Sequence, residues 1–175
     1  MVKILQKDEQ SLREKAEKVS VADIGSGKIK KVLHDMREAM RGEKDAVAIA
    51  APQIGVPLRI FMASGKVFDG VPQEETSAEK KPEAREMVFI NPEITKLSRK
   101  KVSMEEGCLS VRWWYGTVER SEKATVKAHD EDGKIFTRGA SGLLAQIFQH
   151  ETDHLNGVLF TDKAENLREE PPKKE

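Results

Sequence analysis

The 175-residue chain has one cysteine, few aromatic residues and no excess of charge of either sign. With Cys108 alone, no intrachain disulfide can form, which favours a reducing compartment. The 30 basic and 30 acidic residues cancel, so the charge balance indicates neither DNA nor a membrane surface as a partner. The opening MVKILQKDEQ lacks the apolar run of a signal peptide, and no stretch is long and apolar enough to span a bilayer. These absences predict a soluble protein.

The length and the 38% content of hydrophobic residues fit one domain with a core. We expect that domain to occupy residues 1–162. A charged tail follows at 163–175, in which the two prolines at 171–172 end any helix and the last residues are expected to be disordered. The stretch 64–86 is rich in charge and turn formers, shows neither helical nor strand periodicity, and is expected to be an exposed loop or insertion.

A first amphipathic helix is predicted over 27–41. Ser26 precedes it as a capping residue, and Gly42 marks its end. The residues expected to face inward are Ile29, Val32, Leu33, Met36 and Met40. His34 lies among polar neighbours on the opposite side, so we expect it to face solvent and to have no function.

Short β-like runs fill most of the chain after this helix. The runs are 58–63, 87–90, 94–97, 116–119, 124–129 and 134–138. The Asp-Gly pair at 132–133 predicts that the last two form a hairpin. His129 ends one of these runs beside acidic turn residues, and we expect a surface histidine there and not a site residue.

The sequence HETDH at 150–154 is the most informative feature of the chain. It lies in a second predicted helix, about 142–155, which follows Ser141 and stops at the Asn-Gly pair 156–157. Two histidines four residues apart share one face of a helix, and the glutamate beside the first can reach a water bound to the same ion. The motif therefore predicts a hydrolytic metalloenzyme.

The two histidines continue an apolar stripe of this helix. The stripe consists of Leu143, Ile147, His150 and His154. Its spacing predicts that the imidazoles face the core together with the apolar residues. Imidazoles carried inward need a polar partner, and a metal ion supplies one. The alternative is an ordinary polar helix face, which the stripe argues against.

Two histidines leave such a site one ligand short, because a catalytic zinc-type site usually has three protein ligands and an open water position. A downstream glutamate, as in thermolysin-like proteases, would have to come from the predicted tail. The metzincin pattern HExxHxxGxxH fails because Phe160 stands where its last ligand would be. Cys108, in the polar turn EEGCLS at 105–110, is the expected third ligand. A buried apolar role and a nucleophilic Cys-His role remain its alternatives.

Three motifs together resemble the peptide deformylase family. They are AAPQIG at 50–55, EGCLS at 106–110 and QHETDHLNG at 149–157, in this order along the chain. The resemblance implies an α+β fold in which antiparallel strands pack around a central helix that carries HExxH. It also implies that residues 1–162 form a catalytic domain that removes the N-formyl group from polypeptides beginning with formylmethionine.

The resemblance also implies roles for single residues. The implied metal ligands are Cys108, His150 and His154. The Cys-His-His set alone suggests zinc, so Fe(II), the usual ion of the family, is expected by resemblance only, with zinc or nickel able to occupy the site. Glu151 is expected to take a proton from water and to return it to the leaving amine. The Gln53 side-chain amide and the Leu109 backbone N–H are expected to stabilise the charge on the formyl oxygen.

An apolar pocket beside the metal is expected to hold the substrate methionine. The candidate pocket residues are Val47, Leu143 and Ile147. Gln146 departs from the apolar residue often found at its place and is expected to make the pocket rim more polar.

Two further departures from the family pattern lie near the expected cleft. Ala46 and Ala48 stand where the motif GxGLAAxQ has glycines. They add strain if the backbone there has a positive φ, and otherwise their methyl groups narrow the cleft. Arg112 replaces the proline that commonly follows EGCLSV, and Trp113 and Trp114 place two large aromatic rings near the mouth, where they either bind peptide or pack.

We expect an active enzyme that acts on N-formylmethionyl peptides and nascent chains, with no membrane or DNA partner. Its expected location is the bacterial cytoplasm or, after processing, an organelle, and a transient contact with the ribosome is left open. The first alternative is a deformylase-like peptide-binding protein that retains the metal but is catalytically impaired, as Ala46 and Ala48 suggest. The second is a metallopeptidase that cuts internal amide bonds, which the missing downstream ligand disfavours.

Overall fold

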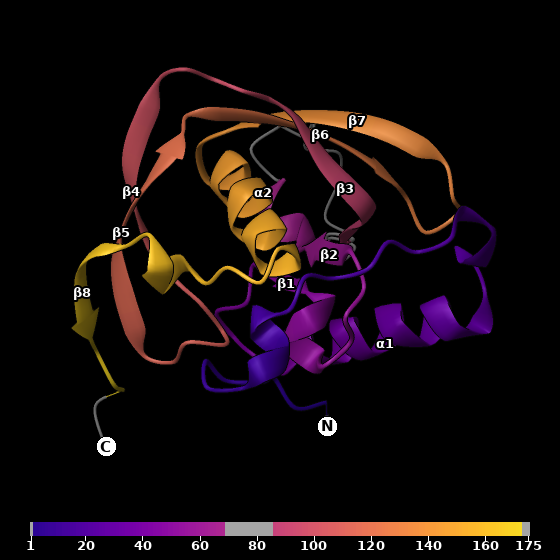
Figure 1. The fold of residues 1–175 in the computed structure, drawn as a ribbon, viewed down its shortest axis with the longest axis horizontal. Helices are drawn as coiled ribbons and strands as arrows, with labels where there is room; N and C mark the ends of the chain where they lie inside the picture. Colours follow the sequence, from indigo (N-terminus) through magenta and orange to yellow (C-terminus); the bar gives the residue numbers. More distant parts are fainter. Residues whose placement is uncertain (1, 69–85, 173–175) are drawn as a thin grey trace, which may run out of the picture.

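The computed structural model describes residues 2–68 and 86–172. These residues form two α-helices, eight strands and five short 3-10 helices (Figure 1). Residues 69–85, which make up most of the loop predicted over 64–86, lie outside the described residues. The end of the predicted tail, residues 173–175, also lies outside them. Neither described helix has the length and apolar character needed to cross a membrane.

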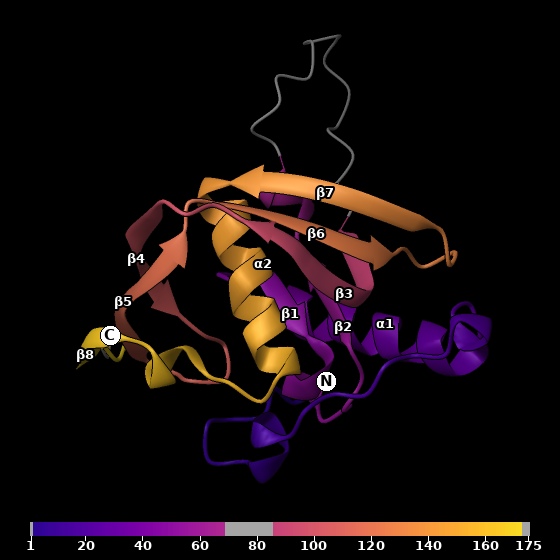
Figure 2. The same cartoon turned by 45° about the horizontal axis from the view of Figure 1, so that its top comes forward.

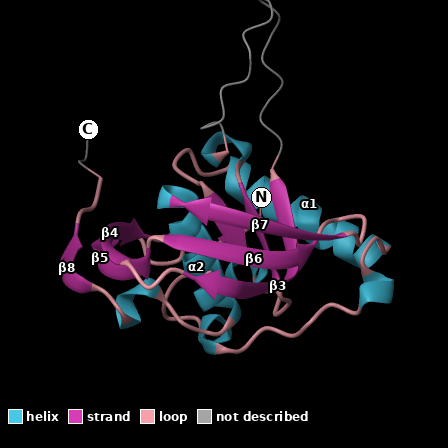
Figure 3. Ribbon diagram, turned by 90° about the horizontal axis from the view of Figure 1, so that it is seen from above, coloured by secondary structure: helices cyan, strands magenta, loops and turns pink. Residues whose placement is uncertain are grey.

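The strands are divided between two antiparallel sheets. The larger sheet has the order β1-β2-β3-β6-β7, and the smaller has the order β4-β5-β8. The larger contains β1 (Ala48–Ala50), β2 (Ile60–Ala63), β3 (Met87–Leu97), β6 (Lys123–His129) and β7 (Ile135–Ser141). The smaller contains β4 (Lys101–Gly107), β5 (Trp114–Ser121) and β8 (Glu165–Glu169). The small sheet gathers at one end of the molecule (Figure 3), and the predicted α+β class with antiparallel strands is confirmed.

Strands β1 and β2 and the first half of β3 are buried on both faces because a helix covers each face. Along β2, Ile60 and Met62 pack with helix α1 (Gly27–Arg41), whereas Phe61 between them points to helix α2 (Gly142–Leu155). The Phe61 ring stacks on Phe89 at 4.4 Å between centroids, and Phe148 of α2 lies 5.2 Å from Phe89. Burying an apolar side chain of this size contributes about 1.5–3 kcal/mol. This packing holds α2 beneath the large sheet (Figure 2).

Both helices have the bounds that the sequence predicted. At the start of α1, the Ser26 hydroxyl accepts a hydrogen bond from the Ile29 N–H at 3.4 Å, and Gly42 forms the C-cap. The five predicted inward residues are all buried, and His34 is exposed, as expected. In α2, Asn156 follows as the C-cap, and the last two turns contain the HETDH motif.

The strand predictions were partly wrong. The runs predicted at 87–90 and 94–97 are one strand, β3, with an irregular register between Ile90 and Glu93. The hairpin between β6 and β7 is confirmed, with Gly133 in the left-handed conformation at a φ of 80°. Strands β1 and β4 were not predicted. Strand β8 lies inside the stretch expected to be a tail, so the small sheet includes residues beyond 162.

Candidate active site

The last turns of α2 and the turn after β4 bring three metal-binding side chains together. The side chains of His150 and His154 approach Cys108, and one ligand atom from each of the three lies within 4.8 Å of the others. His154 Nε2 is 3.3 Å from the Cys108 sulfur. The structure thus assembles the three residues expected as ligands, and the group fits a single metal ion.

A buried chain of charged side chains orients the first histidine. His150 Nδ1 is 2.9 Å from a carboxylate oxygen of Glu106. The other ring nitrogen, Nε2, is then the one that could bind a metal. Arg120 donates two hydrogen bonds to the same Glu106, at 2.7 and 2.9 Å, and a third to Asp153 at 2.7 Å. Since Asp153 belongs to the HETDH motif, the network runs from α2 through β4 and β5 and back to α2.

The charges of this network follow from its contacts. Burial acts to raise the pKa of Glu106, but hydrogen bonds from His150 and Arg120 outweigh it and lower that pKa to about 2. Burial lowers the pKa of His154 well below its usual value, which keeps this imidazole in the neutral form that binds metals. Burial also disfavours the charged form of His150, yet its contacts with Cys108 and Glu106 raise its pKa well above the usual value. Metal binding would release that proton.

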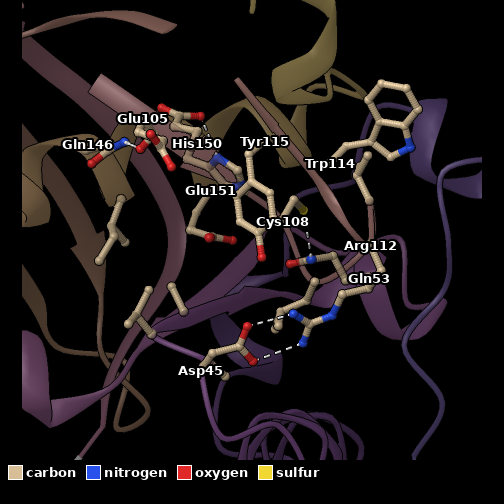
Figure 4. A pocket seen from close by; sticks show the side chains of 18 of the residues that line it. Asp45, Gln53, Glu105, Cys108, Arg112, Trp114, Tyr115, Gln146, His150 and Glu151 are labelled. Carbon is tan, nitrogen blue, oxygen red and sulfur yellow. Dashed lines mark hydrogen bonds and ion pairs between the residues drawn. The ribbon is translucent and has the colours of Figure 1, made fainter. Parts of the chain in front are cut away.

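Glu151 points into the same cavity as Cys108 (Figure 4). Its Oε2 atom is buried and has no hydrogen-bond partner among the described residues. Burial raises the pKa of Glu151 to about 7, so the group can exchange a proton near neutrality. A buried carboxylate oxygen without a protein partner is costly, and such an atom suits a site that receives water or substrate.

Gln53 is held so that its amide nitrogen faces the sulfur. It lies in the 3-10 helix Ala51–Ile54, directly after β1. Its side-chain oxygen accepts the Ala50 N–H at 2.8 Å, and its Nε2 donates to the Ser110 hydroxyl at 3.1 Å. The same nitrogen is 3.6 Å from the Cys108 sulfur. These bonds fix which end of the amide faces the site.

The cysteine begins a tight turn at 108–111, closed by a 3.0 Å hydrogen bond from the Val111 N–H to the Cys108 carbonyl. The Ser110 N–H donates to the Cys108 sulfur at 3.4 Å. The N–H of Leu109, the second residue of the turn, makes no hydrogen bond within the described parts of the chain. It is therefore available to an acceptor bound in the cavity.

The cavity beside these groups has a volume of about 240 Å³. All three residues expected to form the methionine pocket, Val47, Leu143 and Ile147, line it. Ile147 is 4% exposed, as the helical stripe predicted, but Leu143 is 50% exposed and does not face the core. Because it lies in the first turn of α2, it forms part of the rim instead.

The two alanines in place of glycines line the cavity without backbone strain. Among the described residues other than glycine, only Asn91 and Asn166 have a positive φ. Ala46 and Ala48 therefore need no glycine-like conformation, and the strain considered from the sequence is absent. Since both line the cavity, their methyl groups take up space in it.

Gln146 ties α2 to β4. Its side-chain nitrogen donates to the Glu105 carbonyl at 2.8 Å, and the residue is buried although it lines the cavity. The side-chain nitrogen of Gln146, which was expected to make the rim more polar, is thus bonded to the backbone of β4.

An ion pair spans the cavity mouth. Arg112 donates to Asp45 at 2.6 and 3.0 Å and to Glu43 at 2.7 Å, which joins the turn before β5 to the segment before β1 (Figure 4). Its guanidinium also lies 4.8 Å from the Trp113 ring centroid. Both Trp113 and Trp114 line the cavity, where the sequence had placed them, and Trp113 is exposed.

Sequence reasoning missed the supporting residues. Glu106 and Ser110 stand inside the EGCLS motif, so their position beside the ligand was a usable signal. Arg120 had no such signal, because only the antiparallel pairing of β4 with β5 brings it to Glu106. Neither His34 nor His129 lines the cavity, so neither is a residue of this site, as expected. His129 is half-buried, however, and its Nδ1 is buried without a partner among the described residues, so the expected surface position was wrong for this ring nitrogen.

A sequence model of the family described as "Polypeptide deformylase" matches residues 1–170. The chain belongs to the peptide deformylase family. The match includes the three motifs and strand β8, so the family's sequence pattern reaches beyond residue 162.

Two curated relatives and one solved structure illustrate the similarity. "Peptide deformylase 1A, chloroplastic/mitochondrial" from Arabidopsis thaliana is 42% identical over 154 residues, which are 87% of this chain and 57% of the relative. "Peptide deformylase 1" from Pseudomonas syringae pv. tomato is 40% identical over 174 residues, 99% of this chain and 93% of the relative. The Met-Ala-Ser-bound class I type b peptide deformylase of Acinetobacter baumannii is 31% identical, with a TM-score of 0.78 and coverage of 93% and 98%. This chain thus spans little more than half of the plant relative.

Proposed function

We propose that the protein is a peptide deformylase, which hydrolyses the formamide bond of peptides beginning with formylmethionine. One observation carries the proposal: the ligand atoms of Cys108, His150 and His154 converge within 4.8 Å beside a buried carboxylate oxygen of Glu151 that has no hydrogen-bond partner in the described parts of the chain. The family match and the names of the relatives support this chemistry, and none of them favours an impaired binding protein or a general peptidase.

The donor set fits one divalent cation. Cys108, His150 and His154 would hold it through one thiol and two imidazoles, and the orientation of His150 by Glu106 is typical of metal-binding histidines. A cation held there would act as a Lewis acid on the formyl carbonyl and would lower the pKa of water. Fe(II), with zinc or nickel as alternatives, is the ion expected for the family and stays a prediction.

Glu151 moves the proton in this proposal. Its carboxylate takes a proton from the attacking water and delivers it to the nitrogen of the leaving amine. A pKa raised to about 7 by burial suits a group that must accept and release a proton at neutral pH.

Two donors are aimed at the charge that develops on the formyl oxygen. We assign this role to the Leu109 N–H, which makes no hydrogen bond to any described residue, and to the Gln53 side-chain amide. Neither has to reorganise much during the reaction, because the turn at 108–111 and the bond from Gln53 to Ser110 fix their positions.

The apolar side of the cavity would hold the methionine side chain. Val47, Leu143 and Ile147 form this wall in the proposal, and the relative crystallised with Met-Ala-Ser supports it. The substrates would be formylated nascent chains in a bacterial cytoplasm or an organelle, in keeping with the bacterial and plastid or mitochondrial relatives. Contact with the ribosome stays a prediction.

The test is the release of formate from a short N-formylmethionyl peptide by anaerobically purified, Fe(II)-loaded protein, with the metal content of the same sample recorded. We expect metal-dependent release and no cleavage of the unformylated peptide. Cleavage of only the unformylated peptide would favour a general peptidase. Binding of formyl-peptide by fully loaded protein without release would favour an impaired binding protein.

Glu151→Gln sharpens this test. It keeps the three ligands, so we expect normal metal content but a kcat lower by about 10²-fold or more, since the proton carrier is lost. Exposed Glu14 provides the matched control, and Glu14→Gln should leave kcat unchanged. Near-normal turnover by Glu151→Gln would remove Glu151 from the role assigned to it.

A further inference from the structure

Three consecutive residues near the N-terminus lie against the back of the active site. The Leu5 N–H donates to the Gln53 carbonyl at 2.8 Å, and Gln6 Nε2 donates to the Leu109 carbonyl at 3.1 Å. The Lys7 ammonium lies 5.1 Å from the Trp114 ring centroid. None of residues 5–7 is among those that line the cavity. The segment therefore contacts the carbonyls of the two residues that carry the proposed oxyanion donors without itself lining the cavity.

The Leu109 carbonyl belongs to the central peptide of the turn at 108–111. In a four-residue turn, the central peptide can adopt two opposite orientations, which distinguish turn types I and II. The same peptide carries the Ser110 N–H, which donates to the Cys108 sulfur at 3.4 Å. In the observed orientation, the N–H faces the sulfur and the carbonyl faces Gln6. The opposite orientation would lose both bonds and turn the carbonyl oxygen toward the thiolate.

Gln6 is restrained well enough to select one orientation. Its side chain is half-buried, and its Nε2 also lies 3.4 Å from the carbonyl of Ile4. The adjacent backbone bond from Leu5 to Gln53 fixes the segment on which Gln6 stands, and Leu5 packs in the apolar cluster that includes Cys108. A donor held on both sides loses little freedom when it binds the turn.

We propose that Gln6 is a positioning residue, whose side-chain amide locks the Leu109–Ser110 peptide so that the Ser110 N–H stays on the ligand sulfur. Its effect on turnover rests on the proposed deformylase function, whereas its effect on the sulfur does not. Gln6 touches neither substrate nor metal in this role and acts through the turn.

The informative substitution is Gln6→Glu, which keeps the shape of the side chain but replaces the donor with an oxygen facing the Leu109 carbonyl. Gln10→Glu is the matched control. Gln10 is exposed in the 3-10 helix Gln10–Arg13, and its substitution introduces the same charge. We expect Gln6→Glu to lower kcat about tenfold with KM changed less than about twofold, since the change reaches the ligand sulfur through the Ser110 N–H and not the wall that would bind substrate. Gln6→Ala, without the repulsion, should show a smaller loss of kcat.

A second readout does not depend on activity. In protein loaded with Co(II) alone, the thiolate-to-cobalt charge-transfer absorption reports on the ligand sulfur, and Gln6→Glu should shift this band while Gln10→Glu should not. The proposal is wrong if Gln6→Glu equals Gln10→Glu in both kcat and spectrum. It is also wrong if Gln6→Glu lowers only the melting temperature, because Gln6 would then serve packing alone. If the metal-loaded wild-type protein released no formate, the proposed function would fail, and the cobalt spectra would still decide the role of Gln6.

Discussion

Two clusters of ion pairs flank the active site, and they differ in burial far more than in distance. Behind the histidines, Arg120 and Glu106 pair at 2.7 Å with side chains 4% and 2% exposed. At the cavity mouth, Arg112 and Asp45 pair at 2.6 Å with side chains 17% and 59% exposed. Water screens the mouth pair, whereas removing one partner of the inner pair leaves a charge in a low-dielectric interior. Burial, and not length, therefore decides what each pair contributes.

The largest expected effect comes from breaking the inner pair. Arg120→Met leaves Glu106 as a buried charge whose remaining partner is His150, and it also removes the bond to Asp153. We expect a loss of about 3–5 kcal/mol in the free energy of unfolding, measured by urea denaturation of the metal-free protein. An equal loss from the corresponding change at the mouth, Arg112→Met, would contradict the comparison.

Glu106→Gln tests what the inner cluster does for the metal. The amide keeps the volume of the side chain, but it loses the charge that holds the His150 ring. We expect metal affinity to fall about 10–100-fold, as for other residues that orient a metal ligand, measured by competition with a chelator. Unchanged affinity would mean that α2 alone orients His150.

The smallest effect on stability is expected at the mouth. Arg112→Met should change the free energy of unfolding by less than about 1 kcal/mol, because exposed pairs contribute little. It frees the turn before β5 from Asp45, so KM for formyl peptides should change by about two- to fivefold with kcat retained. Steady-state kinetics at low and high salt provide the check. In wild type, KM should move with salt in the direction of the variant, since salt screens the pair.

The two helices could be predicted because their signals are local. Ser26 caps the first, Gly42 and Asn156 mark the ends, and the apolar spacing shows which face is buried. Strand β4 was missed because its sequence, KVSMEEG, places the charged Glu106 on a buried face, which hides the alternation that identifies a strand. Strand β8 was missed because ENLRE is almost entirely polar and lies at a sheet edge.

The three expected metal ligands could be named from the sequence because the HETDH spacing predicts two of them and the family resemblance implies the full set. The HETDH motif supplies two ligands on one helix face, and Cys108 is the only thiol. The residues that hold these ligands were not accessible in the same way. Arg120 reaches Glu106 only through the pairing of β4 with β5, and Gln6 reaches Leu109 across 103 residues of chain. Such contacts depend on tertiary structure, which no local pattern encodes.

Strand β8 has a consequence for how the protein behaves among its own copies. It pairs with β5 at Trp114 and Tyr115, and so covers the backbone edge of that strand next to two large aromatic rings. An open edge of this kind can pair with an edge of another molecule and begin aggregation. The covering strand is short and carries charged side chains such as Arg168 and Glu169, which make it a poor template for further pairing. Residues expected from the sequence to belong to a charged tail thus cover a strand edge that could otherwise pair with another molecule.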